Sequence, residues 1–389
     1  MFEFTYQNPV KICFGNGMIG KTGEELAAFG VKKVLLVYGR NSIKLNGVFD
    51  IVTTSLKKSG IEFVEHGGVQ SNPLLSHVYA GIEKACAEKT DALLAVGGGS
   101  VIDTVKAISL GLANDGDVWD FYCSKRIPEK AIPLFTVLTI PAAGSEMNGG
   151  TVITHDETRE KLAVVNPLLY PKVSILDPAV TVSVPMDYTA YSASDAISHT
   201  IESYLTRADG FCPVQDGYAE GVVRAIMRST ERIRANPADL EARASMMWAA
   251  TLAWNFLGSS GVGPWTTPAH TLEHPLSGRF NIAHGAGLAV TQPGWMAWEL
   301  KRRPERVAAF ARAIMGVVEA DDAVAGVKGI ELFRAWLAGI GCPVTLKACG
   351  IGEADIPILA ADAVHLAKLW GTGSEYTEDV MSAIYRACI

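Results

Sequence analysis

Hydrophobic positions in the first part of the chain form short, continuous apolar runs, which alternate with segments of helical spacing. The runs lie at Val34–Tyr38, Ile61–Glu65, Asp91–Val96 and Leu134–Ile140, and the helical segments at Gly47–Ser59, Leu75–Glu88 and Val101–Leu112. A strand that is buried on both faces is typically a continuous apolar run. The alternation therefore predicts a parallel, doubly wound sheet with helices on both faces.

The pattern changes in the second half of the chain. Thr151–Thr154 and Lys161–Val165 flank a polar stretch, which predicts a hairpin, and Val173–Leu176 predicts one more short strand. From about Thr189 onward helical spacing dominates, most clearly in Val214–Arg234, Asp239–Leu257, Pro304–Val318 and Gly329–Ile340. We expect an α/β domain over residues 1–183 and an all-helical domain over residues 184–389.

Composition and charge narrow the class of protein. Of the 389 residues, 49% are hydrophobic and 19% charged, as in a soluble globular enzyme, and the net charge of −7 gives no electrostatic footprint for nucleic acid or anionic membrane. The apolar runs are too short to span a bilayer, and the N-terminus lacks a signal-peptide pattern, so cytoplasm is the expected compartment. The seven cysteines are scattered and form no CxxC, which argues against a disulfide framework or a zinc–thiolate site.

Two glycine motifs are candidates for binding a nucleotide. Gly15–Gly20 matches GxGxxG, but no acidic residue follows at the end of the next strand, so an ordinary turn is the favoured interpretation. Gly97–Ser100 directly follows a buried strand and opens a helix, where glycines and free N–H groups suit a phosphate. Asp103, in the first turn of that helix, could hydrogen-bond a ligand or only complement the helix dipole.

The most informative signal is the clustering of histidines, because the chain has only eight. Asp195 and His199 are four residues apart on an expected helix, which puts both side chains on one face. His270 and His274 have the same spacing, and His284 follows soon after. Imidazole and carboxylate ligands suit iron, zinc, cobalt or nickel. Chemistry alone leaves open which of these three later histidines are ligands.

Aromatic residues gather just before the second histidine cluster. Two interpretations of this segment are equally consistent with the sequence: its side chains line an apolar substrate pocket, or they pack in the core of the helical part. The residues are Trp254, Asn255, Phe256 and Trp265.

Several motifs together resemble a known family. In chain order they read FGNG, VYGRNSIK, GGGSVIDTVKA, TIPAAGSEMN, SILDP, DAISHTIE, HTLEHPLSG and AHGAGLAV. Over essentially its whole length the chain resembles the iron-containing, group III alcohol dehydrogenases, and within them the butanol-dehydrogenase-like branch of NAD(P)H-dependent aldehyde reductases. The resemblance implies a Rossmann-like α/β domain followed by an all-helical domain, the fold that this family shares with dehydroquinate synthases.

The resemblance also implies roles for individual residues. By position, Asp195, His199, His270 and His284 match the family's ligands to Fe²⁺ or Zn²⁺, and His274 matches a histidine near the substrate that is not a ligand. We expect His274 to relay a proton, although a ribose hydroxyl and water could do so instead. Residues that match the coenzyme-binding positions are Gly98, Gly99, Ser100, Asp103, Thr139, Asn148 and Lys161.

One departure from the family bears on the choice of coenzyme. Many members end the first strand of the domain with an Asp that binds the adenosine ribose, whereas this chain has Gly39, Arg40 and Asn41 there. Loss of the acid removes repulsion against a 2′-phosphate, and Arg40 could pair with that phosphate. We therefore expect NADP(H) in preference to NAD(H), with Arg40 as a solvated surface charge as the alternative.

The expected function is the metal-dependent interconversion of primary alcohols and aldehydes by hydride transfer with NAD(P)(H), as in an NADPH-preferring aldehyde reductase or butanol dehydrogenase. The alternative is a glycerol-dehydrogenase-like or dehydroquinate-synthase-like enzyme that acts on a polyol or a sugar-derived substrate. Those relatives use three protein ligands, so the fourth matching position argues against them. The resemblance further implies a homodimer, and no nucleic-acid or membrane partner is expected.

Overall fold

The computed structural model describes residues 1–208 and 210–389, and the chain divides into two compact units. We call residues 7–184 and 238–251 the α/β unit, and residues 1–6, 185–237 and 252–389 the helical unit. Two segments belong to the unit opposite to the one predicted from a division at 183/184. Residues 1–6 belong to the helical unit, and residues 238–251 belong to the α/β unit. That division stays a prediction about where one domain ends and the next begins.

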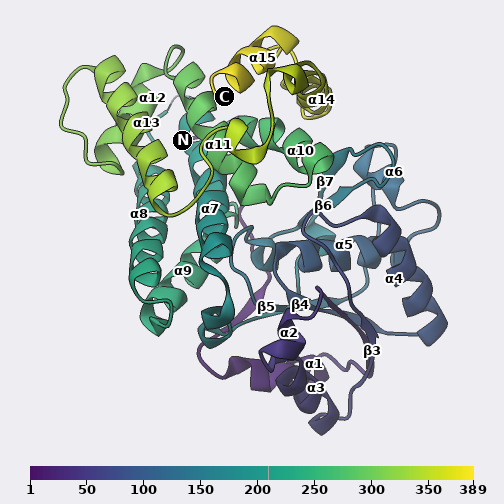
Figure 1. Cartoon of the computed structure of the whole chain (residues 1–389). Helices are drawn as coiled ribbons and strands as arrows, with labels where there is room; N and C mark the ends of the chain where they lie inside the picture. Colours follow the sequence, from purple (N-terminus) through teal and green to yellow (C-terminus); the bar gives the residue numbers. More distant parts are fainter. Residues whose placement is uncertain (209) are drawn as a thin grey trace. The chain divides into compact units, whose positions relative to one another are not determined.

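A sheet of six parallel strands forms the centre of the α/β unit (Figure 1). In the order in which they pair, the strands are β1 (Lys11–Phe14), β8 (Val173–Leu176), β5 (Leu134–Leu138), β4 (Ala92–Gly97), β2 (Lys33–Tyr38) and β3 (Glu62–His66). A separate antiparallel pair consists of β6 (Gly150–Thr154) and β7 (Lys161–Val165). The parallel sheet and the hairpin confirm the prediction from the hydrophobic pattern.

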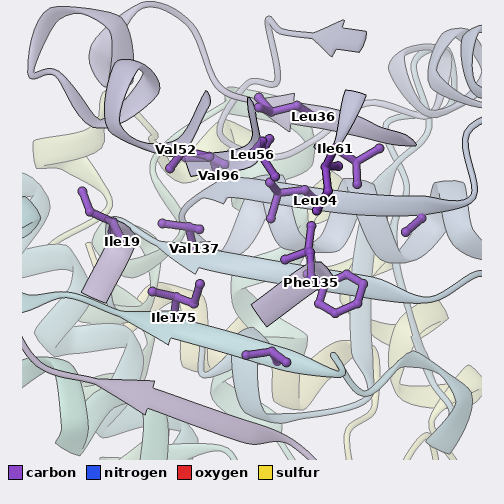
Figure 2. Close-up of a cluster of buried hydrophobic side chains, with 14 of the residues drawn as sticks. Ile19, Leu36, Val52, Leu56, Ile61, Leu94, Val96, Phe135, Val137 and Ile175 are labelled. Carbon is purple, nitrogen blue, oxygen red and sulfur yellow. The ribbon is translucent and has the colours of Figure 1, made fainter. Parts of the chain in front are cut away.

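Helices cover both faces of this sheet because its strands are apolar on both sides. The helices of the unit are α1 (Thr22–Ala27), α2 (Ser42–Leu45), α3 (Val48–Lys58), α4 (Leu75–Glu88), α5 (Gly99–Ala113), α6 (Trp119–Tyr122) and most of α9 (Leu240–Ala253). On one face, Leu36 and Leu94 pack with Val52 and Leu56 of α3 in a buried cluster, shown in Figure 2. On the other face α5 packs against β4 and β5.

The strand order creates a point where a ligand can bind. From β2 the chain moves outward to β3, and it then returns to the other side of β2 to form β4, β5 and β8. The order therefore reverses between β2 and β4, which pair with Tyr38 opposite Val96. In open α/β sheets, ligands bind beyond the carboxyl ends of the strands at such a reversal. Both segments that follow these strands were predicted to bind the coenzyme.

The helical unit contains no strand among its described residues. Its helices are α7 (Met186–Thr206), α8 (Pro213–Ala235), α10 (Pro268–Phe280), α11 (His284–Glu299), α12 (Pro304–Ala313), α13 (Asp322–Gly339), α14 (Ile356–Leu369) and α15 (Glu378–Arg386). None of the helices in the described part of the chain has both the length and the apolar character that crossing a bilayer requires.

Some predicted boundaries were wrong for local reasons. The helix predicted to reach Val318 ends at Ala313, because Gly316 takes a left-handed conformation (φ +72°) of the kind that terminates helices. The helix predicted from Gly329 begins at Asp322, capped by Asp321, whose side chain accepts a hydrogen bond from the Val324 N–H. Strand β1 was not predicted, because Cys13 is its one fully buried residue and no apolar run marks it.

Candidate metal and coenzyme sites

Helix α7 supplies the first two residues of the candidate metal site. Asp195 and His199 lie one turn apart on the helix, as their spacing predicts, and the Asp195 Oδ1 is 3.1 Å from the His199 Nε2. Asp195 is buried and His199 nearly so. The His199 ring also packs against an aromatic side chain, since its centroid lies 4.5 Å from that of the Trp254 ring.

Helices α10 and α11 bring two more histidines to the same carboxylate oxygen. The Nε2 atoms of His270 and His284 lie 3.9 and 3.8 Å from Asp195 Oδ1. A side chain at Gly285 would place its Cβ 1.9 Å from the Tyr191 carbonyl oxygen on α7, so the glycine permits the close packing of α11 on α7. That packing positions the neighbouring His284 beside Asp195.

The atoms that converge here lack the partners that buried polar atoms normally have. Asp195 Oδ1 and His270 Nε2 are both buried without a hydrogen-bond partner among the described residues. Burial alone would raise the pKa of the Asp195 carboxyl, but the imidazoles of His199, His284 and His270 outweigh it and hold that pKa below its usual range. An anionic oxygen facing three imidazole nitrogens fits a divalent cation of the iron or zinc type.

His274 lies beside this group without joining it. Its ring is 5.7 Å from the ring of His284 and 6.4 Å from that of His270, between centroids. Glu273, His274 and His284 offer a second set of mutually close ligand atoms, so His284 adjoins both sets. The Trp370 ring meets the His274 ring edge to face at 5.3 Å. An aromatic residue therefore lies on this side of the histidines as well.

The predicted coenzyme-binding loops meet at the carboxyl ends of adjacent strands. Helix α5 begins at Gly99 with Gly98 as its N-cap, and the first N–H groups of a helix have no partner within it, so they can bind a phosphate. A Cβ on Gly98 would lie 3.1 Å from the Ile140 Cβ, and one on Gly99 would lie 3.1 Å from the Ala143 Cβ. The loop that follows β5 therefore leaves little room for side chains at these glycines.

The end of β2 is open by comparison. Gly39 is half-buried and Arg40 is exposed. Among the described residues, the only atom within 4 Å of a Cβ at Gly39 is the Val69 carbonyl oxygen, at 3.6 Å. Thr139, after β5, donates its N–H to the Gly97 carbonyl oxygen at 3.0 Å, which ties the third strand end to the glycine loop. In the motif Gly15–Gly20, by contrast, residues 15–17 form a turn after β1, and the remaining residues lie in a short 3₁₀ helix (Met18–Lys21) that leads into α1.

Three predicted coenzyme residues are engaged within the protein. The Asp103 carboxylate accepts hydrogen bonds from Ser145 Oγ at 2.6 Å and from the Val152 N–H at 3.0 Å. Asn148 is buried, and its side chain donates to the Gly144 carbonyl oxygen at 2.8 Å and accepts from the Gly150 N–H at 2.7 Å. The Lys161 Nζ donates to Asn72 Oδ1 at 3.1 Å. Asp103 and Asn148 thus hold the loop between β5 and β6, and Lys161 contacts the loop between β3 and α4.

Lys106, which the sequence did not single out, joins the same network. Its Nζ is fully buried on α5 and lies 2.7 to 3.2 Å from acceptor atoms of Ser145, Asn148 and Gly150. Burial lowers the pKa of Lys106 to about 8, while the charges of Asp103 and Glu146 oppose that shift. The ammonium group thus ties α5 to the loop between β5 and β6.

Comparison with known proteins identifies the family. Residues 9–178 match the family model described as iron-containing alcohol dehydrogenase, and residues 189–389 match that of the C-terminal part of the Fe-containing alcohol dehydrogenase family. The chain belongs to the iron-containing alcohol dehydrogenase family. The resemblance seen in the sequence motifs is confirmed, and so is the fold class.

Relatives that match over their full length are named as butanol dehydrogenases or aldehyde reductases. The chain is 39% identical over 388 residues to a probable NADH-dependent butanol dehydrogenase of Bacillus subtilis, with 99% of each chain covered. It is 32% identical over 394 residues to an NADPH-dependent aldehyde reductase of Escherichia coli, with 100% of each covered. The solved structure of an NADH-dependent butanol dehydrogenase of Thermotoga maritima matches with a TM-score of 0.96 and 43% identity, covering 100% of this chain and 99% of that one.

The structure of this iron-containing alcohol dehydrogenase adds two carboxylates that the sequence analysis missed. The His270 Nδ1 is hydrogen-bonded to Glu202 on α7, and the His284 Nδ1 to Glu273 on α10. Both glutamates are fully buried. The motifs DAISHTIE and HTLEHPLSG contain them, so spacing along one helix face was a signal for Glu202, which lies seven residues after Asp195.

Proposed function

We propose that this protein interconverts primary alcohols and aldehydes, with the metal held by Asp195, His199, His270 and His284. The observation that supports this most directly is the convergence of three imidazole Nε2 atoms on one buried oxygen of Asp195, at 3.1, 3.9 and 3.8 Å. Family membership makes the protein an alcohol dehydrogenase of the iron-containing type. A divalent metal, Fe²⁺ or Zn²⁺, supplies Lewis acidity toward the substrate oxygen when it is bound.

The chain's own part in hydride transfer is to bind and orient. Gly98, Gly99 and Ser100 offer backbone donors at the start of α5 to the pyrophosphate of a nicotinamide coenzyme. Thr139, from the neighbouring strand end, and the loop that holds Asn148 border that position. Asp103 supports that loop through Ser145, and Lys161 contacts Asn72 in the loop between β3 and α4. Holding the nicotinamide against the substrate carbon is a contribution of positioning and electrostatics.

We further propose that NADPH is preferred to NADH. Gly39 leaves the end of β2 without an acid, Arg40 is exposed there, and Asn41 follows it. A guanidinium can bind a 2′-phosphate through two hydrogen bonds. The relatives differ in this respect, since the Bacillus protein is named as NADH-dependent and the Escherichia protein as NADPH-dependent. The coenzyme ratio of this protein is therefore a direct test of Gly39 and Arg40.

His274 is proposed to relay the proton that alcohol oxidation releases and aldehyde reduction consumes. It is buried beside the proposed ligands, with Trp370 against its ring. The imidazole nitrogens can hold and transfer a proton near neutral pH. Its removal is expected to lower turnover while the metal stays bound. A homodimer in the cytoplasm, with a small aldehyde as substrate, completes the proposal.

The decisive experiment is a paired assay on metal-analysed protein. Aldehydes such as butanal are reduced with NADPH and with NADH, before and after chelation and after refilling with iron or zinc. Activity that disappears on chelation and returns with the metal supports the proposal. If fully metal-loaded protein reduces no aldehyde with either coenzyme, the proposed reaction is wrong.

A further inference from the structure

Glu202 holds His270 by two of its atoms. Its Oε1 accepts a hydrogen bond from the His270 backbone N–H at 3.1 Å, and its Oε2 is hydrogen-bonded to the His270 Nδ1. His270 is the third residue of α10, so its N–H is one of the first four that have no partner inside the helix. Glu202 on α7 therefore caps α10 and fixes the ring of its first histidine at the same time.

Glu273 does the same for the ring of His284. Its Oε2 is hydrogen-bonded to the His284 Nδ1, and its Oε1 accepts from the Ser277 hydroxyl one turn further along α10. A Cβ on Gly287 of α11 would lie 2.7 Å from that Oε1, so the glycine leaves space for the carboxylate. Each helix that supplies a histidine is thus tied to another helix by a glutamate.

His199 differs from the other two histidines. Its Nδ1 is buried and has no hydrogen-bond partner in the described part of the chain, and its ring packs against those of Trp254 and His270. Its Nε2 contacts Asp195, but among the described residues only aromatic packing supports the rest of the ring. The three histidines around Asp195 are therefore held unequally, two of them by a carboxylate at Nδ1 and one without such a partner.

Burying the Glu202 and Glu273 side chains destabilises the fold unless hydrogen bonds compensate for the lost water. A carboxylate removed from water is unfavourable unless its oxygens are hydrogen-bonded, and both glutamates are 0% exposed. Because a carboxylate can only accept, each contact with a histidine requires the proton on Nδ1. That tautomer leaves the Nε2 lone pair free, and Nε2 is the atom that faces Asp195 in both histidines.

We propose that Glu202 and Glu273 are positioning residues of the metal centre, and that His199 is the ligand held without such a partner. The glutamates fix the tautomer and orientation of His270 and His284 and make their Nε2 atoms more basic. This inference rests on the proposed function only in taking the three histidines as metal ligands.

The test measures the affinity for Co²⁺ by chelator competition, and the visible spectrum of the Co²⁺-loaded protein. We expect Glu202→Gln and Glu273→Gln to weaken affinity about 10- to 100-fold and to change the spectrum. Glu202→Leu should weaken it further than Glu202→Gln, because the amide still accepts a hydrogen bond. Glu299→Gln is the matched control. Glu299 is equally buried in the helical unit but pairs with Arg302 and Arg303, so its loss should change the unfolding midpoint without changing metal affinity.

The outcomes separate the two proposals. Wild-type affinity and spectrum in both Gln variants, while Asp195→Ala abolishes Co²⁺ binding, would overturn the positioning role and leave the metal centre intact. Equal weakening in Glu299→Gln would also overturn it, because the effect would then follow from the loss of any buried carboxylate. If the wild-type protein and Asp195→Ala both fail to bind Co²⁺, the proposed metal site itself is wrong. The near-isosteric Gln variants keep the test valid if the Leu variant does not fold.

Discussion

The candidate metal centre and the coenzyme loops are built from different parts of the polypeptide. In the helical unit, the proposed ligand atoms belong to side chains of α7, α10 and α11, and buried glutamates contact the far sides of two of the rings. In the α/β unit, the proposed binding groups are backbone N–H groups at the start of α5, where Gly98 and Gly99 have little room for a side chain. One region depends on which side chains are present and the other on which are absent. The two should therefore fail in different ways when they are mutated.

The largest effect is expected from removing a proposed ligand. His270→Ala should lose the metal, and aldehyde reduction should fall by about 10²- to 10³-fold, because the Lewis-acid contribution is worth several kcal/mol. Metal content by elemental analysis and coenzyme binding by fluorescence check the two regions separately. Retention of metal with full activity would contradict the ligand assignment, and lost coenzyme binding would contradict the separation between the regions.

The reciprocal change is Gly98→Val. A Cβ alone at this position would lie 3.1 Å from the Ile140 Cβ, so the larger valine side chain would collide with Ile140. The collision would displace the backbone N–H donors from the proposed pyrophosphate position. Loss of one hydrogen bond to a charged group predicts a rise of roughly 10- to 100-fold in the coenzyme KM. Metal content should stay at the wild-type level. An unchanged coenzyme KM would show that this loop does not bind the phosphates.

A smaller effect is expected where the α/β unit leaves room for a side chain. Gly39→Asp should fit, since the nearest neighbour of its Cβ is the Val69 carbonyl oxygen at 3.6 Å. The added carboxylate should repel a 2′-phosphate and shift the ratio of kcat/KM for NADPH over NADH about tenfold toward NADH. Arg40→Ala should shift the ratio in the same direction and by less. A ratio that neither substitution moves would mean that the adenosine end binds elsewhere.

The last prediction concerns stability rather than binding, and a stacked pair of histidines in the α/β unit, of which His66 is buried and His77 half-buried. The His66 and His77 rings stack at 4.1 Å, and burial, together with the neighbouring His77, lowers the pKa of His66 to about 4. The unfolded chain binds this proton near pH 6.5 and the folded one does not, so stability falls as the pH drops from 6.5 toward 4. Between pH 7 and pH 5 the wild-type free energy of unfolding should fall by about 2 kcal/mol more than that of His66→Phe. Equal losses in urea unfolding would contradict the burial argument.

The sequence predicted the helical spacing of Asp195 with His199 and of His270 with His274, because spacing along a helix fixes which side chains share a face. It did not predict which histidines meet, since that depends on how α7, α10 and α11 pack. The same limit applies to His66 and His77, which lie 11 positions apart along the chain and stack on each other in the fold. Lys106 was missed because nothing along the chain distinguishes a lysine in a helix that will be fully buried.

By itself, the sequence determined the alternation of buried strands and helices, the glycine loop after β4 and the family to which the chain belongs. These features are local, since they depend on periodicity, on glycine at defined positions and on short motifs. Only the tertiary structure decided the reversal of strand order between β2 and β4, and the convergence on Asp195 Oδ1. It also decided which histidine each glutamate contacts, because the hydrogen bond between Glu202 and His270 joins residues 68 positions apart and requires that two helices pack together first.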